Sequence, residues 1–319
     1  MRITCAFARA NATNYYHFIN RIPYICPDKN EGPDMKRKIP TVALIYDFDG
    51  TLSPGNMQEF GFIQAIGKTP KEFWALSNVN PEGQEVNHVL SYMKLMIDEA
   101  RKAGVSLTRE SFVSFGRNIR LLDGVKEWFS IINQYGKEHG VHIEHYINSS
   151  GLTELIEGSS IAGEFKKIFA CSFWYDENGI AVWPAVAVDY TGKTQFLFKI
   201  AKGITDISDN TKVNESRPEE DKPIPFTNMI YFGDGETDIP CMKIVKMFGG
   251  NSIAVWRDGN EKQQKTAHKL LRQNRVNFMC RADYTIGGEI YKVVTTIIDK
   301  VKAEDEFTRL QRKKGNYVR

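Results

Sequence analysis

The sequence predicts a doubly wound α/β fold, with helices packed on both faces of a parallel sheet. Its first strong signal is the run TVALIY at 41–46, which is apolar, β-branched and uninterrupted. Such a run is typical of a strand that is buried on both faces. Similar strand-like runs follow at 141–148, 228–232 and 252–256. Helical patterns separate these runs at 124–135, 194–202, 238–247 and 260–273, and this alternation predicts the fold class.

Two stretches depart from the alternation. From about 53 to 120 the pattern is helical without a convincing strand, most clearly at 84–102, so we expect a helical domain inserted after the first strand. At 169–188, two β-rich segments flank the run DENG (176–179), and its Asn-Gly pair predicts a hairpin. A charged segment at 203–225, rich in Pro and Asn, is expected to be an exposed loop.

The expected domains are an N-terminal extension at 1–38, an α/β core at 39–54 and 121–319, and the helical insertion at 55–120. The first 33 residues lack a basic segment followed by a clean apolar stretch, so we expect no signal peptide. We expect Met35 to be the natural start and the residues before it to be an upstream extension or arm.

Composition excludes several classes of protein. The 319 residues are 42% hydrophobic and 25% charged, as in ordinary globular proteins. A net charge of +3 is too small to indicate nucleic-acid binding, and the basic C-terminus is expected to be a solvated tail. The five cysteines form no C-x-x-C pair, which favours a reduced, cytoplasmic protein. No apolar stretch could span a bilayer, so we expect no membrane association. The oligomeric state is left open.

Two carboxylates follow the first strand. Asp47 and Asp49 lie in the run DFDGT (47–51), at the end of a strand where open α/β sheets bind their ligands. Gly50 permits a tight turn there. Buried carboxylates are costly unless they are paired or bound to a metal, so the pair indicates a site. The alternative is a solvated acidic turn.

Polar side chains also follow the later strands. The run NSSG (148–151) ends the second strand before a short helix, where Ser149 or Ser150 would either bind an anion or cap the helix. The run GDGETD (233–238) places Asp234 and Asp238 at a third strand end, and Lys193 opens a helix just before it. Clustered carboxylates, a hydroxyl and a lysine suit Mg²⁺-assisted phosphoryl transfer.

These motifs resemble those of the haloacid dehalogenase (HAD) superfamily. The run at 47–51 is similar to its first motif (D-x-D-G-T), and the run at 233–238 is similar to its fourth (G-D-G-x-x-D). Ser149 matches the second motif and Lys193 the third, by position. The resemblance implies a Rossmann-like core with the helical insertion as a C1 cap over the active site. The residues around Ser149 are similar to those of phosphoserine-phosphatase-like members.

The resemblance implies a role for each matched residue. Asp47 would attack phosphorus and form an aspartyl-phosphate, and Asp49 would protonate the leaving group and then activate water. Thr51, Ser149, Ser150 and Lys193 would hold the phosphoryl group. Asp47, Asp234, Asp238 and the Asp49 backbone carbonyl would form the Mg²⁺ site. Asp49 argues against a dehalogenase, since that branch lacks a carboxylate there. Lys199 competes with Lys193, and we prefer Lys193 because it opens the helix.

The function implied is a Mg²⁺-dependent phosphatase that acts on a small phosphomonoester. A phosphomutase of the same superfamily shares these residues, and a non-catalytic phospholigand-binding regulator is a third reading. Two other sequence patterns resemble known binding motifs, but we expect neither to form a site. The run GKT (192–194) lacks the first glycine of a Walker A loop. His139, His142 and His145 are expected to lie at a helix-to-strand junction on different faces, and not to bind zinc.

Overall fold

The computed structural model describes residues 39–79 and 82–315. The expected N-terminal extension, with Met35 as its expected start, lies outside the described residues. No helix in the described part is long and apolar enough to cross a membrane.

The described residues build a seven-stranded sheet in the order β4-β3-β2-β1-β5-β6-β7. All neighbouring strands pair in parallel except β3 and β4, which are antiparallel. The strands are β1 (Thr41–Tyr46), β2 (His142–Leu152), β3 (Lys167–Tyr175), β4 (Ala181–Val186), β5 (Met229–Gly233), β6 (Asn251–Trp256) and β7 (Phe278–Arg281). The central position of β1 explains its uninterrupted apolar run, because all but its first residue are buried.

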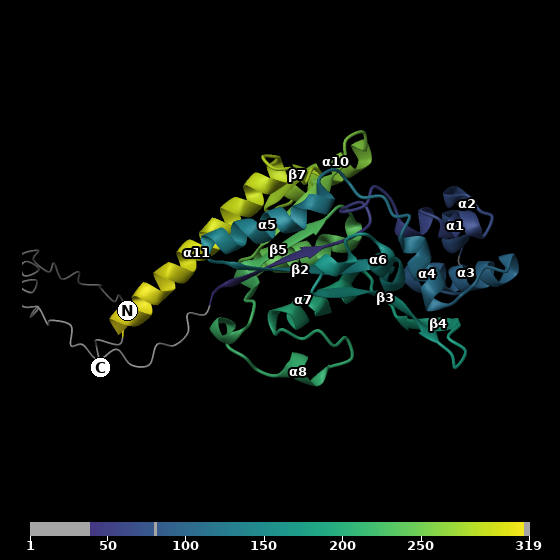
Figure 1. Cartoon of the computed structure of the whole chain (residues 1–319), viewed down its shortest axis with the longest axis horizontal. Helices are drawn as coiled ribbons and strands as arrows, with labels where there is room; N and C mark the ends of the chain where they lie inside the picture. The colour runs from purple at the N-terminus through teal and green to yellow at the C-terminus, as the bar shows by residue number, and fades with distance from the viewer. Residues whose placement is uncertain (1–38, 80–81, 316–319) are drawn as a thin grey trace, which may run out of the picture. The chain divides into compact units, whose positions relative to one another are not determined.

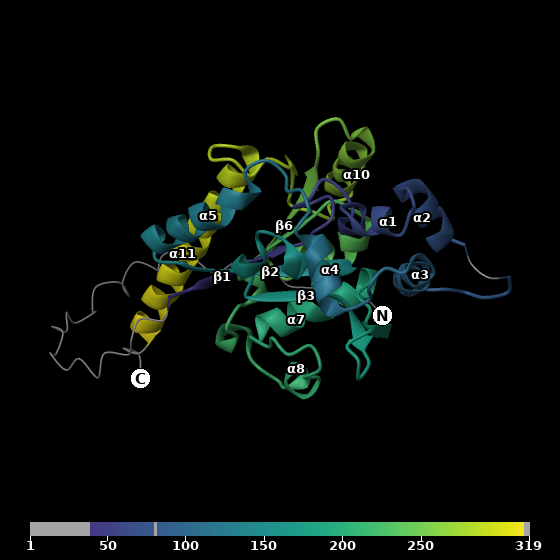
Figure 2. The same cartoon turned by 45° about the vertical axis from the view of Figure 1, so that its right-hand side comes forward.

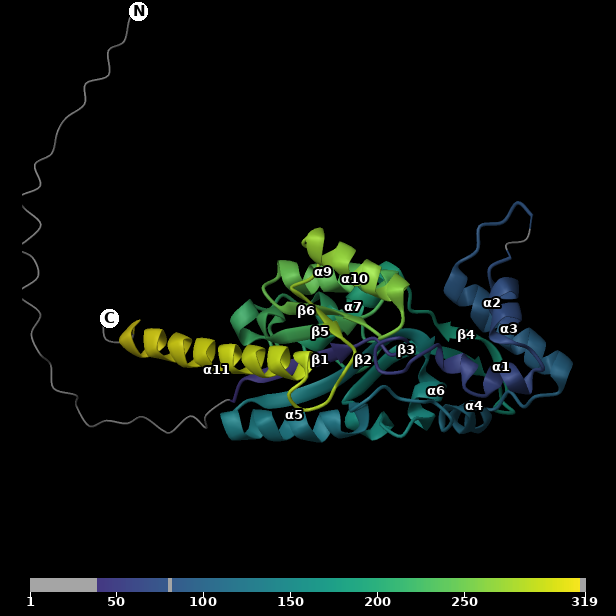
Figure 3. The same cartoon turned by 90° about the horizontal axis from the view of Figure 1, so that it is seen from above.

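Helices cover both faces of the sheet, as Figure 3 shows in edge view. One face carries α5 (Val125–His139) and α6 (Thr153–Gly158), and α11 (Glu289–Gly315) packs beside α5. The other carries α7 (Thr194–Ala201), α9 (Ile239–Met247) and α10 (Glu261–Arg272). This is a doubly wound α/β fold, and the predicted fold class is confirmed.

The segment between β1 and α5 is helical. It contains η1 (Met57–Glu59), α1 (Phe62–Ala65), α2 (Pro70–Ser77), α3 (His88–Ala103) and α4 (Arg109–Gly116). Helices α1 to α4 lie to the right of the central strands in Figure 1, and in Figure 2 α1, α2 and α3 stay to the right while α4 lies in front of the sheet. Local sequence explains where α2 begins and where α3 begins and ends. The hydroxyl of Thr69 accepts a hydrogen bond from the Glu72 amide and caps α2, and Asn87 caps α3 in the same way. Gly104, with φ of 67°, ends α3.

The end of β2 and the segment at 203–225 differ in detail from the expectation. Strand β2 continues to Leu152, one residue beyond the run NSSG expected to end it, so Ser149 and Ser150 lie within the strand. The expected loop at 203–225 contains two short helical turns, α8 (Thr211–Asn214) and η4 (Glu219–Asp221). The expected hairpin forms as the antiparallel pair β3 and β4, and it is continuous with the main sheet, because β3 pairs with β2 along its first half and with β4 along its second. Further 3-10 turns lie in the connections, among them η2 (Ala162–Glu164), η3 (Tyr190–Lys193) and η5 (Phe226–Asn228).

Candidate active site

Asp47 is the first residue after β1, at the edge where the parallel strands end. Its backbone amide donates to the carbonyl of Phe232 in β5 at 2.9 Å, which extends the pairing of the two strands by one residue. The residue is only 5% exposed. Because the neighbouring parallel strands end at the same edge, Asp47 meets side chains from distant parts of the chain.

Lys193 is the partner of Asp47. It is the last residue of η3 and directly precedes α7. Its side chain is fully buried, and its Nζ is 2.9 Å from Oδ1 of Asp47 and 2.7 Å from Oδ1 of Asp238. Burying an ammonium is costly unless carboxylates compensate it, and here two of them do. Lys199, the competing lysine, donates instead to the backbone carbonyls of Asp206 and Asp209. The structure therefore places Lys193, and not Lys199, against the carboxylates.

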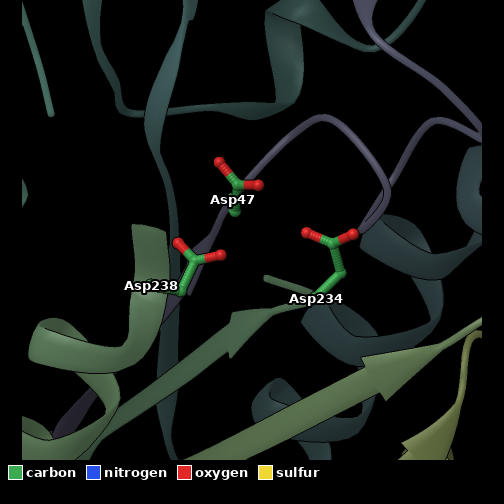
Figure 4. A group of neighbouring side chains, drawn as sticks. All are labelled: Asp47, Asp234 and Asp238. Carbon is green, nitrogen blue, oxygen red and sulfur yellow. The ribbon is translucent and has the colours of Figure 1, made fainter. Parts of the chain in front are cut away.

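Three carboxylates converge beside Lys193. Oxygens of Asp47, Asp234 and Asp238 lie within 4.8 Å of one another, and Figure 4 shows the three side chains facing a common space. Asp234 follows β5, and Asp238 ends the turn η6 (Glu236–Asp238) before α9. Oδ2 of Asp238 is buried and has no hydrogen-bond partner in the described residues. An all-oxygen set with an unpartnered buried carboxylate oxygen fits a hard cation such as Mg²⁺.

Asp49 lies near these three carboxylates, but its side chain does not converge with theirs. Its Oδ1 accepts a 2.9 Å hydrogen bond from the backbone amide of Met57. Gly50, next to it, has φ of 74°, and a Cβ at that position would lie 2.1 Å from Oδ2 of Asp234. Only glycine combines this backbone conformation with such a close approach. The turn after β1 thus brings Asp47 and Asp49 to one site, as the sequence predicts.

A cavity of about 580 Å³ opens over these residues. Asp47, Asp49, Ser149, Ser150 and Asp234 line it, together with residues of the helical segment between η1 and α3. The remaining predicted residues are Lys193 and Asp238, which lie buried behind the wall, and Thr51, which is fully buried and also does not line the cavity.

The two serines of β2 differ in their hydrogen bonds. Oγ of Ser149 accepts from the Gly151 amide at 3.0 Å, whereas the buried Oγ of Ser150 has no partner in the described part of the chain. The alternative interpretation, that one of them caps the next helix, is wrong. Helix α6 begins at Thr153, and its N-cap residue, Leu152, makes no side-chain cap.

Burial shifts the pKa values of the acidic residues upward. Burial raises the pKa of Asp47 to about 6; the Asp238 carboxylate adds to this and Lys193 opposes it. Burial and the Asp47 charge raise the pKa of Asp234 to about 7. Burial also raises the pKa of Asp49 well above its usual range, with a further contribution from Asp47. Burial alone would lower the pKa of Lys193, but Asp238 and Asp47 together raise it. Shifts of this kind, in a cavity, are typical of catalytic sites.

Gln263 is a polar residue of the site that the sequence does not predict. Nε2 of Gln263 donates to Oδ2 of Asp234 at 2.5 Å, and its Oε1 accepts from the Arg257 amide at 2.9 Å. Gln263 lies on α10, whose buried stripe otherwise consists of Ala267 and Leu270. A glutamine within the apolar stripe of an amphipathic helix is the signal that could identify it.

The three histidines behave as ordinary structural residues. His145 is buried and contacts Oη of Tyr46 and Oδ1 of Asn133, at 3.1 Å each. His142 is exposed on the same strand, and His139 pairs with Asp299. None of them belongs to the acidic group described above, which is the metal-type cluster found among residues 39–79 and 82–315.

Comparison with known families decides where this chain belongs. The model of the haloacid dehalogenase-like hydrolase family matches residues 44–243, which include all the site residues named above except Gln263. The chain is a member of this family. The hydrolase is also 30% identical to an uncharacterized protein of Borreliella burgdorferi, over 78% of this chain and 94% of that relative.

Solved structures share the fold of this hydrolase. A HAD family hydrolase from Salmonella enterica subsp. enterica serovar Typhi matches with a TM-score of 0.51 and 16% identity, over 81% of this chain and 72% of the other. A probable phosphoserine phosphatase from Vibrio cholerae matches with a TM-score of 0.52 and 12% identity, over 84% and 68%. The resemblance to the HAD superfamily is therefore confirmed, and so is its fold.

Proposed function

We propose that this hydrolase is a Mg²⁺-dependent phosphatase that acts on a small phosphomonoester through an aspartyl-phosphate on Asp47. One observation carries the proposal. A single lysine, Lys193, holds Asp47 and Asp238 together at the base of a cavity that Asp49 also lines. A nucleophile, a cation to bind phosphoryl oxygens and an acid are thus within one site.

The first step transfers the phosphoryl group to the enzyme. Oδ1 of Asp47 is held by Lys193, so Oδ2 is the atom available to attack phosphorus. A bond forms between this oxygen and phosphorus, and the bond from phosphorus to the alcohol oxygen breaks. Asp49 donates its proton to that leaving oxygen, and burial, which raises the pKa of Asp49, favours the protonated form that can donate.

The second step releases phosphate. A water molecule attacks phosphorus and gives its proton to Asp49, which returns to its starting state. The bond between phosphorus and Asp47 breaks and restores the carboxylate. The products are the free alcohol and inorganic phosphate, so the cycle needs no other reactant.

Asp47, Asp234, Asp238 and the backbone carbonyl of Asp49 would hold Mg²⁺, which when bound neutralises charge on the phosphate. Lys193 would bind a phosphoryl oxygen beside Asp47. Ser149 and Ser150 line the cavity, and their hydroxyls would donate to the other oxygens. Thr51 would act by supporting the turn that carries Asp49, because it does not line the cavity.

We further propose that residues 55–120 act as a C1 cap that closes over the substrate and excludes water during the first step. Residues of η1, α2 and α3 line the cavity, which supports this assignment. The free, buried thiols of Cys171, Cys241 and Cys280 favour a reducing, cytoplasmic environment for the enzyme.

Phosphate release from a panel of phosphomonoesters tests the proposal. We expect activity with Mg²⁺, its loss with EDTA, and its loss in Asp47→Asn, which keeps the shape of the side chain but not its nucleophilic charge. Wild-type turnover in Asp47→Asn would overturn the mechanism. Formation of an isomeric phosphoester without free phosphate would indicate the phosphomutase instead. Binding without turnover of any substrate would indicate a regulatory protein.

A further inference from the structure

The lining of the cavity is acidic beyond Asp47, Asp49 and Asp234. It also includes Glu59, at the end of η1, and Asp189, just before η3. No lysine or arginine of the described chain lines the cavity. Among the described residues that line it, the basic side chain is that of His88, the exposed first residue of α3.

Both carboxylates are held by neutral donors. Oε1 of Glu59 accepts from Nε1 of Trp74 and from Nδ2 of Asn56, both at 2.8 Å. Oδ2 of Asp189 accepts from Nδ2 of Asn87 at 2.5 Å. Neither forms an ion pair with any residue that the structure describes. Their positions are therefore fixed, and their negative charge is left without a countercharge.

A buried amide adds an independent sign of a ligand. Gln58 also lines the cavity and is only 2% exposed, yet its Oε1 has no hydrogen-bond partner in the described structure. Buried acceptors without a partner are rare in folded proteins. A ligand that supplies an N–H group would satisfy Oε1 of Gln58, and an ammonium supplies three such donors and no acceptor.

We propose that the substrate is the phosphomonoester of an alcohol that carries a cationic amine and no carboxylate. The inference rests on the proposed phosphatase activity. Glu59 and Asp189 balance the charge of the amine, Gln58 accepts one of its hydrogen bonds, and the rings of Trp74 and Tyr92, which also line the cavity, attract cations. A substrate with an additional carboxylate would meet two like charges and no lysine or arginine, which disfavours its binding.

Phosphoethanolamine and phosphoserine test this directly, since they differ by one carboxylate. With Mg²⁺ present, we expect kcat/KM for phosphoethanolamine to exceed that for phosphoserine at least about tenfold. Glycerol 3-phosphate has no charge in its alcohol part, and its kcat/KM should be lower than that of phosphoethanolamine. The variants Glu59→Gln and Asp189→Asn should each raise KM for phosphoethanolamine and reduce the preference. Glu110→Gln, an exposed change on α4 outside the cavity, should retain it.

p-Nitrophenyl phosphate separates the two proposals. Turnover of this general substrate without a preference for phosphoethanolamine over the other two would overturn the inference and leave the phosphatase intact. An unchanged preference in both carboxylate variants, with unfolding midpoints as in the wild type, would also overturn it. Failure to hydrolyse any substrate would overturn the proposed function, and this inference with it.

Discussion

The backbone amide of Met57 donates a 2.9 Å hydrogen bond to Oδ1 of Asp49. Met57 is the first residue of η1, so the proposed general acid is oriented by the helical segment and not by the sheet. Asp47, two residues earlier, is bound to the sheet and to Lys193. The nucleophile and the acid are therefore held by different parts of the fold, and each can be tested separately.

Asp49→Asn tests the acid. Asparagine keeps the size of the side chain and can still accept from Met57, but it cannot donate a carboxylic proton. We expect kcat for an alkyl phosphomonoester to fall about 10²–10⁴-fold, the range of general acid–base catalysis. The loss for p-nitrophenyl phosphate should be much smaller in the first step, because nitrophenolate leaves without protonation. Burst kinetics with both substrates measure this difference, and equal losses would exclude Asp49 as the acid.

Gln263 tests the arrangement of the metal site. Its amide donates to Oδ2 of Asp234, and partners of this kind commonly contribute 10–100-fold to metal affinity. We expect Gln263→Ala to need about tenfold more Mg²⁺ for half-maximal activity, and calorimetric Mg²⁺ titration should show the same weakening. Gln264→Ala, one residue along α10 and outside the cavity, is the matched control. An identical Mg²⁺ response in Gln263→Ala and the control would refute a role for Gln263.

Gly50→Ala tests the turn between the two aspartates. The change imposes a strained backbone at φ of 74° and a clash with Asp234 Oδ2 at 2.1 Å. Gly67→Ala imposes the strain alone, because Gly67 has φ of 70° and nothing within 4 Å of its added Cβ. We expect Gly67→Ala to lower the free energy of unfolding by about 1–2 kcal/mol and to stay active. Gly50→Ala should lose more stability and most of its activity. Chemical denaturation and phosphate release measure both, and an active, equally stable Gly50→Ala would contradict the described turn.

The burial of His145 should make the free energy of unfolding depend on pH. Burial lowers the pKa of His145 to about 3, whereas an unfolded histidine titrates near 6.5. The folded state therefore excludes a proton that the unfolded state takes up. The resulting stability is complete above about pH 6.5 and is lost as the pH falls from there toward 3, by roughly 1.4 kcal/mol per pH unit.

Urea denaturation between pH 6 and 4 measures this slope. His145→Gln should lower stability at pH 7 but show a flatter dependence on pH than the wild type. His142→Gln, an exposed change on the same strand, should keep the wild-type slope. Equal slopes in all three proteins would show that His145 does not titrate in this way.

Much of the fold follows from local sequence. The bounds of β1 are predicted to the residue because its apolar run is buried on both faces and ends at a charged pair. Helix α10 is similarly clear, since Asn260 caps it and its apolar stripe is regular. The strand-like run at 141–148 stops four residues short of the end of β2, because Ser149, Ser150 and Gly151 carry turn signals although they continue the strand. The ladder with β3 is irregular between Asn148 and Leu152, where these residues lie, and it resumes at Leu152.

The site is predictable where a residue follows a strand, and less so elsewhere. Asp47 and Asp234 each follow a parallel strand, so their meeting can be inferred from topology alone. Gln263 reaches Asp234 from the middle of a helical stripe, and its orientation depends on how α10 packs. Glu59 and Asp189 are 130 positions apart in sequence (189 − 59), and only the folded chain brings them to one cavity.

Trapping the covalent intermediate tests the central claim most directly. The hydrolase is mixed with Mg²⁺ and a phosphomonoester, quenched in acid during turnover, treated with borohydride and digested for mass spectrometry. Borohydride reduces an aspartyl-phosphate to homoserine, and we predict homoserine at position 47 and no modified residue in Asp47→Asn. Turnover by the wild type with an unmodified Asp47, or with homoserine at another aspartate, would contradict the account.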